Sequence, residues 1–395
     1  MYDVIVVGAR CAGSPTAMLF ARQGYRVLLL EKAGFPQDTL SSHYIHLEGV
    51  AVLQRWGLLD RLREAGCRPI SHQSYEAPGV RIDGFSLPIG GQRTTYAPRR
   101  YVLDPILADA AVAAGVEFRD SCAVNDLVFE GDRVVGVRYT TASGALATDR
   151  ARLVVGADGM RSLVARKAGA PHVIEHPRMT CTYYSYWAGV PAHFELYERQ
   201  GRWIGVIPTN DDLTLLMAYF PQEEFSAVRK AVEPAYLDAF RTTAPELYER
   251  MTVGERVEQL YGTGHQENYF RKAFGPGWAL VGDAVNHKDS ITARGITEAF
   301  VQAQSLTGHI GEGLHDDAAL QDALRRYEDD LDGNALSHYQ GALNVAELKP
   351  EGRAELLRKL VGHQELIDRY FSTLSGACSL DDFYNTELLT VLDQS

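Results

Sequence analysis

The amino-acid sequence predicts an α/β protein with a mainly parallel sheet, an inserted antiparallel sheet and a helical C-terminal segment. Three apolar runs, Val4–Val7, Leu153–Val155 and Ala279–Val281, each lead into a glycine-containing turn. Uninterrupted apolar runs of this length are typical of parallel strands that are buried on both faces. Two intervening segments are rich in strand-forming residues, and the chain after Gly333 is charged with a helical pattern. Together these features predict two sheets and a helical end.

Composition narrows the class of protein. Hydrophobic residues are 46% and charged residues 23% of the 395 residues, which argues against a disordered chain. The length favours two or three domains of roughly 150 residues each. A net charge of −12 argues against a general binder of nucleic acid or of an anionic membrane. The five cysteines are scattered and form no CxxC pair, so neither a disulfide framework nor a metal site is expected.

The sequence also lacks the signals of membrane insertion and export. No stretch reaches the roughly 18 consecutive apolar residues of a membrane span. The N-terminus has no basic region followed by an apolar signal core, and runs directly into the first strand. We therefore expect a cytoplasmic protein without a membrane span.

The first 31 residues form a predicted Rossmann-like βαβ unit. A strand at Val4–Val7 leads through a glycine turn into a helix over about 14–23, and a second strand at Val27–Leu30 ends at an acidic residue. In such units a pyrophosphate binds at the helix N-terminus, and the acidic residue binds the ribose hydroxyls. Arg10 stands where the usual pattern has glycine, and the alternative for Gly8 and Gly13 is a pair of ordinary turn glycines. The cofactor-binding candidates here are Gly8, Arg10, Cys11, Ala12, Gly13, Glu31 and Lys32.

Three further segments repeat or extend this pattern. Asp158-Gly159 follows the strand that ends at Val155, and a helix is expected over 160–166. Gly282-Asp283 follows a third strand, and a helix is expected over 296–309. Arg100 opens another predicted helix, although a surface arginine is the alternative at that position.

The combination resembles the FAD-dependent monooxygenases of the para-hydroxybenzoate hydroxylase type, the group A flavoprotein hydroxylases. The glycine turn at 8–13 resembles their ADP-binding fingerprint, and segments 100–104, 158–159 and 282–283 resemble their RxxLD, DG and GD motifs. The order and spacing agree to about residue 345. Ser290 and Arg294 replace the usual proline and glutamine of the loop after the GD motif.

The resemblance implies FAD as cofactor and assigns roles to the motif residues. Arg100 is expected at the pyrophosphate or ribityl chain, and Asp283 at the ribityl hydroxyls. Asp158 and Gly159 are expected to contact both FAD and a passing NADH or NADPH. The helix after Gly295 would direct its positive N-terminus at the flavin. The remaining cofactor-binding candidates are therefore Arg100, Asp158, Gly282, Asp283, Arg294, Gly295 and Ile296.

The expected domain organisation is discontinuous. Segments 1–73, 97–172 and 270–345 carry the cofactor motifs, and a three-stranded meander is expected within 124–155. The insertions 74–96 and 173–269 are expected to share one antiparallel sheet, the substrate domain, over the flavin. Residues 346–395 form the helical C-terminal segment.

Aromatic residues and two histidines are the candidates on the substrate side. Strand alternation places Tyr184 and Tyr186 on one face, and Tyr183 and Trp187 on the other. Tyr184, Tyr186 and Trp203 are substrate-pocket candidates, although packing within the sheet is the alternative for each of them. His43 and His287 lie beside expected flavin contacts and are weak catalytic candidates, with a locally bonded loop histidine as the alternative for each.

The family resemblance implies a monooxygenase with a small, aromatic substrate. NADH or NADPH would reduce FAD, O₂ would add at the flavin C4a, and one oxygen would hydroxylate or epoxidise the substrate. One alternative is an FAD-dependent reductase of the geranylgeranyl-reductase kind. A halogenase is a further alternative because 203–208 is similar to a WxWxIP motif, but no lysine occurs between Lys32 and Lys167. A flavin-binding scaffold without turnover is also open, and substrate identity, NADH or NADPH preference and oligomeric state are not readable from the sequence.

Overall fold

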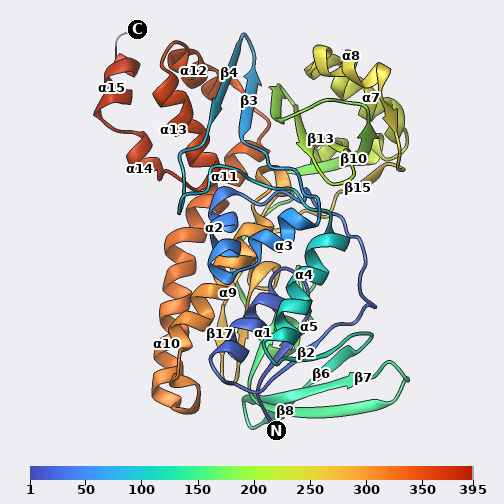
Figure 1. Ribbon diagram of the computed structural model, residues 1–395, viewed down its shortest axis with the longest axis vertical. Helices are drawn as coiled ribbons and strands as arrows, with labels where there is room; N and C mark the ends of the chain where they lie inside the picture. The colour runs from blue at the N-terminus through green and yellow to red at the C-terminus, as the bar shows by residue number, and fades with distance from the viewer. Residues whose placement is uncertain (394–395) are drawn as a thin grey trace.

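The computed structural model describes residues 1–393, and its central element is a parallel sheet (Figure 1). The strand order is β17-β18-β8-β1-β2-β5, in which only β17 runs antiparallel. Apolar runs form the inner strands because both faces are covered, and β1 and β2 contain almost only buried residues. The strands are β1 (Tyr2–Val7), β2 (Val27–Leu30), β5 (Glu117–Arg119), β8 (Leu146–Gly156), β17 (Phe274–Gly275) and β18 (Trp278–Leu280).

Helices cover one side of this sheet, and a meander extends from it. Helix α1 (Gly13–Arg22) packs between α4 (Arg100–Ala113) and α9 (Gly295–Ile310). Strand β6 (Ala123–Glu130) pairs with β7 (Arg133–Thr140), which in turn pairs with β8. The three-stranded meander is thereby confirmed, and it lies at the foot of the molecule in Figure 1.

Further helices complete this lower part. Helices α2 and α10 pack against α9, and α3 lies between α2 and α4. The short helix α5 packs on β6 and β8. The bounds of these helices are α2 (Leu47–Trp56), α3 (Leu59–Glu64), α5 (Leu163–Ala168) and α10 (Asp317–Asp330). Helix α11 (Leu336–Ala346) follows α10 in the chain.

A second sheet occupies the wider upper part of the molecule in Figure 1. Its order is β14-β10-β13-β12-β11-β3-β4, with β15 also paired to β10. All its pairs are antiparallel except β11 with β3, which is parallel, so the expectation of a purely antiparallel sheet was wrong at this one pair. The strands are β3 (His72–Ala77), β4 (Val80–Phe85), β10 (Thr180–Ala188), β11 (Phe194–Arg199), β12 (Arg202–Pro208), β13 (Thr214–Pro221), β14 (Glu255–Arg256) and β15 (Tyr261–Thr263).

The two faces of the upper sheet have different covers. Tyr183 and Trp187 pack with helices α7 (Val232–Thr243) and α8 (Pro245–Val253), whereas Tyr184 and Tyr186 belong to the apolar core on the opposite face. The alternation predicted along β10 is therefore confirmed. A small third sheet of β19 (Asn286–His287), β16 (Asn268–Arg271) and β9 (His172–His176) lies beside the cofactor motifs.

The C-terminal helices are part of the core rather than an appendage. Helices α12 (Glu351–Leu360) and α13 (Gln364–Ser375) pack on strand β4, and apolar side chains such as Leu357 and Phe371 are fully buried there. The amphipathic pattern of α13 explains this, since its apolar stripe needs a partner surface. The short helices α14 (Leu380–Phe383) and α15 (Thr386–Asp393) follow, and residues 394–395 of the predicted C-terminal segment lie outside the described residues.

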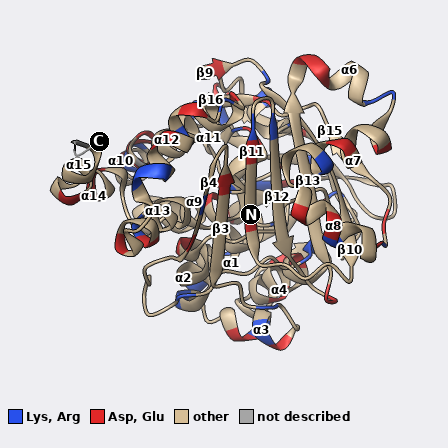
Figure 2. Cartoon of the chain, turned by 90° about the horizontal axis from the view of Figure 1, so that it is seen from above, with Lys and Arg blue, Asp and Glu red and all other residues tan. Residues whose placement is uncertain are grey.

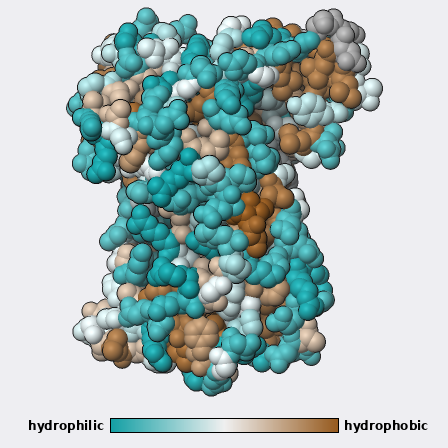
Figure 3. Space-filling model, turned by 180° about the vertical axis from the view of Figure 1, so that it is seen from behind, coloured by the Kyte–Doolittle hydropathy of each residue, from teal (hydrophilic) through white to brown (hydrophobic). Residues whose placement is uncertain are grey.

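The surface is mixed in charge and hydropathy. Acidic and basic residues are interspersed over the elements seen in Figure 2. Apolar residues form separate patches on the face shown in Figure 3, within a largely hydrophilic surface. Across residues 1–393 no helix is both long and apolar enough to cross a membrane. None of the five cysteines is in a disulfide, as expected.

Candidate functional site

A cavity of about 670 Å³ lies at the carboxyl ends of the central strands, where ligands bind in open α/β sheets. Its walls come from the turns that follow β1, β2, β8 and β18, together with the N-terminus of α9. Most of the predicted cofactor-binding residues meet there although they are far apart in the sequence. The predicted residues in the wall are Gly8, Arg10, Cys11, Ala12, Glu31, Lys32, Arg100, Asp158, Gly159, Gly282, Asp283, His287, Arg294, Gly295 and Ile296.

Two glycines allow α1 to begin directly at this cavity. Gly8 has a φ of +97°, and a Cβ there would lie 2.4 Å from the carbonyl oxygen of Ala157. A Cβ on Gly13 would lie 1.7 Å from the carbonyl oxygen of Gly8. Gly13 therefore lies beneath the turn rather than in the cavity wall, and lets the helix press against it. No side chain caps α1, and because the N–H of Ser14 bonds to the carbonyl of Arg10 at 3.1 Å, an anion at this end would meet the helix dipole and the N–H groups of the turn that precedes Ser14.

Glu31 both stabilises the glycine turn and lines the cavity. One carboxylate oxygen accepts a hydrogen bond from the N–H of Ala9 at 2.9 Å, and the other accepts one from the N–H of Ala33 at 3.0 Å. The side chain thus stabilises the glycine turn while it lines the cavity. Each carboxylate oxygen has further lone pairs for a ribose hydroxyl.

Glu31→Gln should weaken the binding of FAD without unfolding the chain. One charged acceptor becomes an amide, so the expected loss is about 1.5–3 kcal/mol, or roughly 10- to 100-fold in Kd. Titration of the FAD-free protein by flavin fluorescence measures it. Glu117→Gln, at an exposed carboxylate bonded to Tyr2, is the matched control and should leave the Kd unchanged. Equal affinities for the Glu31→Gln variant and the parent would contradict the assignment.

Arg100 lies in a buried ion pair at the cavity wall. Its Nε and Nη2 donate to the two carboxylate oxygens of Asp104 at 2.9 and 3.0 Å, one helical turn further on. The thiol of Cys11 lies 3.5 Å from the same carboxylate, and burial raises the pKa of this thiol far above its usual value. Cys11 is therefore a neutral packing residue, and Arg100 presents a fixed cation to the cavity.

The carboxylate of Asp158 is engaged in hydrogen bonds within its own turn. Its carboxylate accepts hydrogen bonds from the hydroxyl of Ser162 at 2.5 Å and from the N–H of Leu163 at 2.6 Å. Helix α5 consequently begins at Leu163 rather than at 160, which corrects the predicted start. Burial raises the pKa of Asp158, against the effect of these donors. Gly159 lies beside it in the wall, and a contact of either residue with NADH or NADPH stays a prediction.

Asp283 differs from Asp158 because its side chain is free. Within residues 1–393 its carboxylate receives no hydrogen bond, while its carbonyl accepts one from Tyr269 at 2.5 Å. The carboxylate lies 4.0 Å from where a Cβ on Gly295 would be, at the uncapped N-terminus of α9. An unoccupied carboxylate at this place suits the hydroxyls of a ribityl chain.

Arg294 points away from the cavity that its backbone lines. Its guanidinium donates to Glu48 at 3.0 Å and to the carbonyl of Leu374 at 3.1 Å. The substitution of the usual glutamine by arginine therefore ties the loop to α2 and to the C-terminal helix α13. Gly295 and Ile296, which follow it, present backbone to the cavity.

A buried polar network that the sequence analysis did not identify supports the same wall. Lys288 forms an ion pair with Glu298, and Asn286 donates to the same carboxylate at 3.4 Å. Gln302 donates to Asn286 at 2.7 Å and accepts from the N–H of Gly282 at 2.6 Å. The network explains how the Gly282 turn is held, and the only sequence signal was the polar spacing along one face of α9.

Asp289 is the second carboxylate that sequence reasoning missed. It lies in the wall, accepts from the hydroxyl of Thr180 at 2.7 Å and from the N–H of Ile291 at 3.2 Å, and is fully buried. Burial raises its pKa to about 6. Its position in the loop between Gly282 and Gly295 was the available signal.

Asp289→Asn should change how stability depends on pH. A raised pKa means that the folded protein favours the protonated acid, so ionisation costs stability as the pH rises from about 4 to about 6. Asparagine should remove that cost, and the difference in unfolding free energy between the variant and the parent should grow by about 2–3 kcal/mol across this window. Urea unfolding with and without saturating FAD measures it. A difference that does not vary with pH would contradict the shift.

The two histidine candidates have different environments. His287 lies in the wall, bonds through Nδ1 to the carbonyl of Glu267, and its ring stacks on Tyr269. His43 lies outside the cavity, directly after the wall residues Ser41 and Ser42, and is fully buried with Nε2 bonded to the hydroxyl of Tyr186. Burial, and then the nearby Arg99, hold the pKa of His43 well below its usual value.

The three aromatic pocket candidates are packed rather than open. Tyr184, Tyr186 and Trp203 are each more than nine-tenths buried and do not line the described cavity. Tyr184 and Tyr186 meet edge to face, with ring centroids 6.0 Å apart. The loops that line the cavity nevertheless touch this layer, since Tyr219 of β13 bonds to the hydroxyl of Ser290 at 2.9 Å.

Comparisons with known proteins agree with this arrangement. A family model described as FAD binding domain matches residues 1–333. Digeranylgeranylglycerophospholipid reductase 1 of Methanopyrus kandleri is 27% identical over 369 residues, which cover 89% of this chain and 91% of that protein. The flavin-dependent brominase Bmp2 has the same fold, with a TM-score of 0.83 at 21% identity over 99% of this chain and 97% of its own. PqsL, a probable FAD-dependent monooxygenase from Pseudomonas aeruginosa, has a TM-score of 0.71 at 20% identity over 94% and 98%.

The cavity itself suits an adenine dinucleotide with a flavin. It has two uncapped helix N-termini for phosphates, a cation at Arg100 and free acceptors at Glu31 and Asp283. A Cβ on Gly282 would lie 2.7 Å from the Cβ of Ala12, so the two turns meet only because this residue is glycine. From the family match and this geometry together, the chain belongs to the FAD-binding-domain family and is an FAD-dependent oxidoreductase.

Proposed function

We propose that the protein is an FAD-dependent monooxygenase of the para-hydroxybenzoate hydroxylase type, which uses NADH or NADPH and O₂ to hydroxylate or epoxidise a small aromatic substrate. The observation that carries the proposal is the layer of aromatic and hydrogen-bonding side chains next to the cofactor cavity. Tyr219 bonds to Ser290 of the cavity wall, and Tyr186 bonds to His43, which follows the wall residues Ser41 and Ser42. Such a layer suits a planar, polar ring.

A buried arginine adds a cation to this layer. The guanidinium carbon of Arg99 lies 3.7 Å from the centroid of the Tyr186 ring, and Arg99 forms ion pairs with Asp38 and Glu258. The two carboxylates already balance the charge of Arg99, so its contact with the ring serves to hold Tyr186 in place. The layer therefore offers an aromatic ring of fixed orientation next to the cavity wall.

In this proposal the protein positions and shields, while bound FAD supplies the redox chemistry. His43 is neutral near pH 7, and its Nδ1 is buried with no hydrogen-bond partner among the described residues. We assign this nitrogen to the polar group of the substrate, with Tyr186 fixing the ring from the other nitrogen. Burial of the whole layer keeps water from the reacting groups.

A reductase of isoprenoid double bonds is the second candidate. It is favoured by the sequence similarity to the Methanopyrus kandleri reductase over most of both chains. A long isoprenoid chain calls for an aliphatic surface, whereas the layer beside this cavity contains Tyr186 and Tyr219, whose hydroxyls bond to His43 and Ser290. The halogenase alternative has the fold of Bmp2 in its favour, but the cation in the layer is Arg99 rather than a lysine amine.

Stopped-flow spectroscopy of the FAD-saturated protein tests the proposal. NADH and NADPH are each mixed with a panel of phenols, anilines and aromatic acids while flavin absorbance and oxygen uptake are recorded. We expect at least one compound to accelerate flavin reduction and to yield a product heavier by one oxygen atom. A geranylgeranyl compound under anaerobic conditions and the same aromatic panel in bromide buffer complete the series, and a saturated isoprenoid or a halogenated product would replace the proposal by the corresponding alternative.

Tyr186→Phe and Tyr183→Phe form a matched pair on one strand. Tyr186 faces His43, whereas Tyr183 lies on the opposite face of β10 with the cover of α7 and α8. We expect Tyr186→Phe to lower product formed per NAD(P)H consumed by about tenfold, since a lost hydrogen bond of about 1–1.5 kcal/mol frees the His43 ring. Tyr183→Phe should match the parent, and equal effects of both variants would contradict a role for this face.

A further inference from the structure

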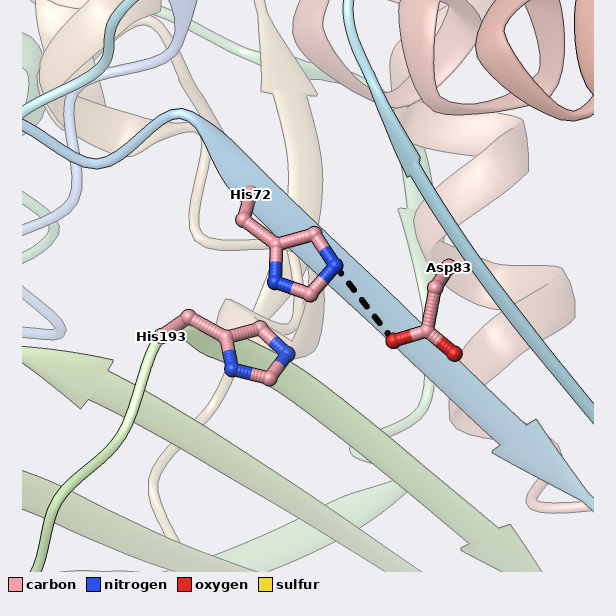
Figure 4. A group of neighbouring side chains, drawn as sticks. All are labelled: His72, Asp83 and His193. Atoms are coloured by element: carbon pink, nitrogen blue, oxygen red, sulfur yellow. Dashed lines mark ion pairs between the residues drawn. The ribbon is translucent and has the colours of Figure 1, made fainter.

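Two histidines and an aspartate gather on the upper sheet, away from the cofactor cavity (Figure 4). His72 opens β3, Asp83 lies near the end of β4, and His193 directly precedes β11. None of the three lines the cofactor cavity. The cluster lies where the β3–β4 hairpin meets β11, which comes more than a hundred residues later in the chain.

The strand register explains why these side chains converge. Gln73 pairs with Phe194 across the parallel ladder of β3 and β11, so the preceding residues His72 and His193 are neighbours with side chains on one face. Asp83 pairs with Ser74, two residues from His72, and shares this face. One nitrogen from each imidazole and one carboxylate oxygen lie within 4.8 Å of one another, and His72 Nε2 is 3.4 Å from Asp83 Oδ1.

The contacts of His193 favour one tautomer of its imidazole. His193 Nε2 bonds to the hydroxyl of Ser74 at 2.9 Å, and its Nδ1 faces the carboxylate of Glu195 at 3.7 Å. A carboxylate next to Nδ1 favours the proton there and leaves Nε2 as a donor of its lone pair.

We propose that His72, Asp83 and His193 bind a divalent transition-metal ion of the zinc type. Two imidazoles and a carboxylate are a ligand set that Zn²⁺ and its neighbours prefer, whereas Mg²⁺ and Ca²⁺ prefer oxygen alone. The rings are stacked, with centroids 4.1 Å apart, so binding turns them until each nitrogen lies about 2.0–2.1 Å from the ion. The three side chains are about a quarter to two fifths exposed, which gives an ion a route from solvent and room for a water ligand.

Arg81 is the competing partner of this site. It donates to Asp83 at 3.1 and 3.2 Å and lies 3.9 Å from Glu76. Metal binding can replace the contact between Arg81 and Asp83, because Arg81 can stay paired with Glu76 when Asp83 turns one oxygen to the ion. A bound ion would fasten the β3–β4 hairpin to β11, so its expected effect is on the stability of the upper sheet rather than on the flavin.

Isothermal titration of the FAD-saturated, tag-free protein with ZnCl₂ tests the proposal, and MgCl₂ is the comparison titration. We expect one Zn²⁺ per chain, no binding of Mg²⁺, and a melting temperature that rises with Zn²⁺. His72→Gln, Asp83→Asn and His193→Gln should each weaken Zn²⁺ binding by more than about tenfold and remove the rise. His265→Gln, at an exposed histidine elsewhere, and Cys378→Ser, at the least buried cysteine, should bind like the parent.

The melting temperature without metal and the FAD content of each variant serve as controls for folding. Each variant should melt close to the parent without metal and retain FAD, so that lost binding reports the ligand rather than the fold. Zn²⁺ binding that survives all three substitutions, or that disappears in His265→Gln or Cys378→Ser, would overturn the proposal. An absence of Zn²⁺ binding to the parent would overturn it as well.

Discussion

Arg100→Met is expected to destabilise the protein by about 3–5 kcal/mol, because it leaves a buried carboxylate without its cation. The side chain of Asp104 is only 1% exposed, and Arg100 holds both its oxygens through a two-pronged pair. Among the described residues, the other hydrogen-bond partner of this carboxylate is the neutral thiol of Cys11. Urea unfolding of the FAD-free protein measures the loss directly, since no cofactor contributes to it.

A double variant separates the pair from general damage. Arg100→Met combined with Asp104→Leu removes both charges, and should recover most of the stability because no buried charge is left unpaired. FAD binding should not recover, since the cation at the cavity wall is still absent. If the single and double variants unfold at the same urea concentration, the ion pair is not the source of the loss.

Gly13→Ala is expected to abolish measurable FAD binding. The added Cβ would lie 1.7 Å from the carbonyl oxygen of Gly8 and 3.1 Å from the side chain of Ala157. The backbone of Gly8 on one side and the short, rigid side chain of Ala157 on the other prevent a local adjustment, so α1 must move away from the turn that it presses against. We expect an increase in Kd of at least about 100-fold, or more than about 2.7 kcal/mol, in a fluorescence titration.

Gly308→Ala is the matched control because it is also a helical glycine. It lies within α9, and nothing stands within 4 Å of an added Cβ. Alanine there should stabilise the helix by about 0.5–1 kcal/mol and leave the Kd for FAD unchanged. A loss of FAD from both variants would show that glycine is needed for helix flexibility rather than for close packing.

The central sheet was readable from sequence because its signals are local. A buried strand, its glycine turn and the next helix are neighbours in the chain, so β1, β8 and β18 could each be recognised separately. The rule that ligands bind at the carboxyl ends of such strands then placed Glu31 and Asp283 in one cavity, as the structure shows. The confirmed faces of β10 follow from the same local logic, since alternation has a period of two.

Features that depend on distant partners were not readable. The parallel pairing of β3 with β11 joins residues more than a hundred positions apart, and no local pattern encodes it. The motif position of Arg294 predicted a contact with the flavin, yet its guanidinium donates hydrogen bonds to Glu48 and to the end of α13. Asp158 is a cap because Ser162 and two N–H groups lie within its reach, which only the turn geometry reveals.

The wall of the cofactor cavity has a consequence for the order of events on the ribosome. Its residues range from Val7 to Gln302, and the last contributors lie on α9. A growing chain therefore presents the phosphate-binding turn after its first few dozen residues, but cannot enclose a flavin until about three quarters of it has been made. Strand β1 gains β8 as its neighbour only after about two fifths of the chain, and β8 gains β18 only after about seven tenths, so until then the apolar edges of these strands depend on temporary protection.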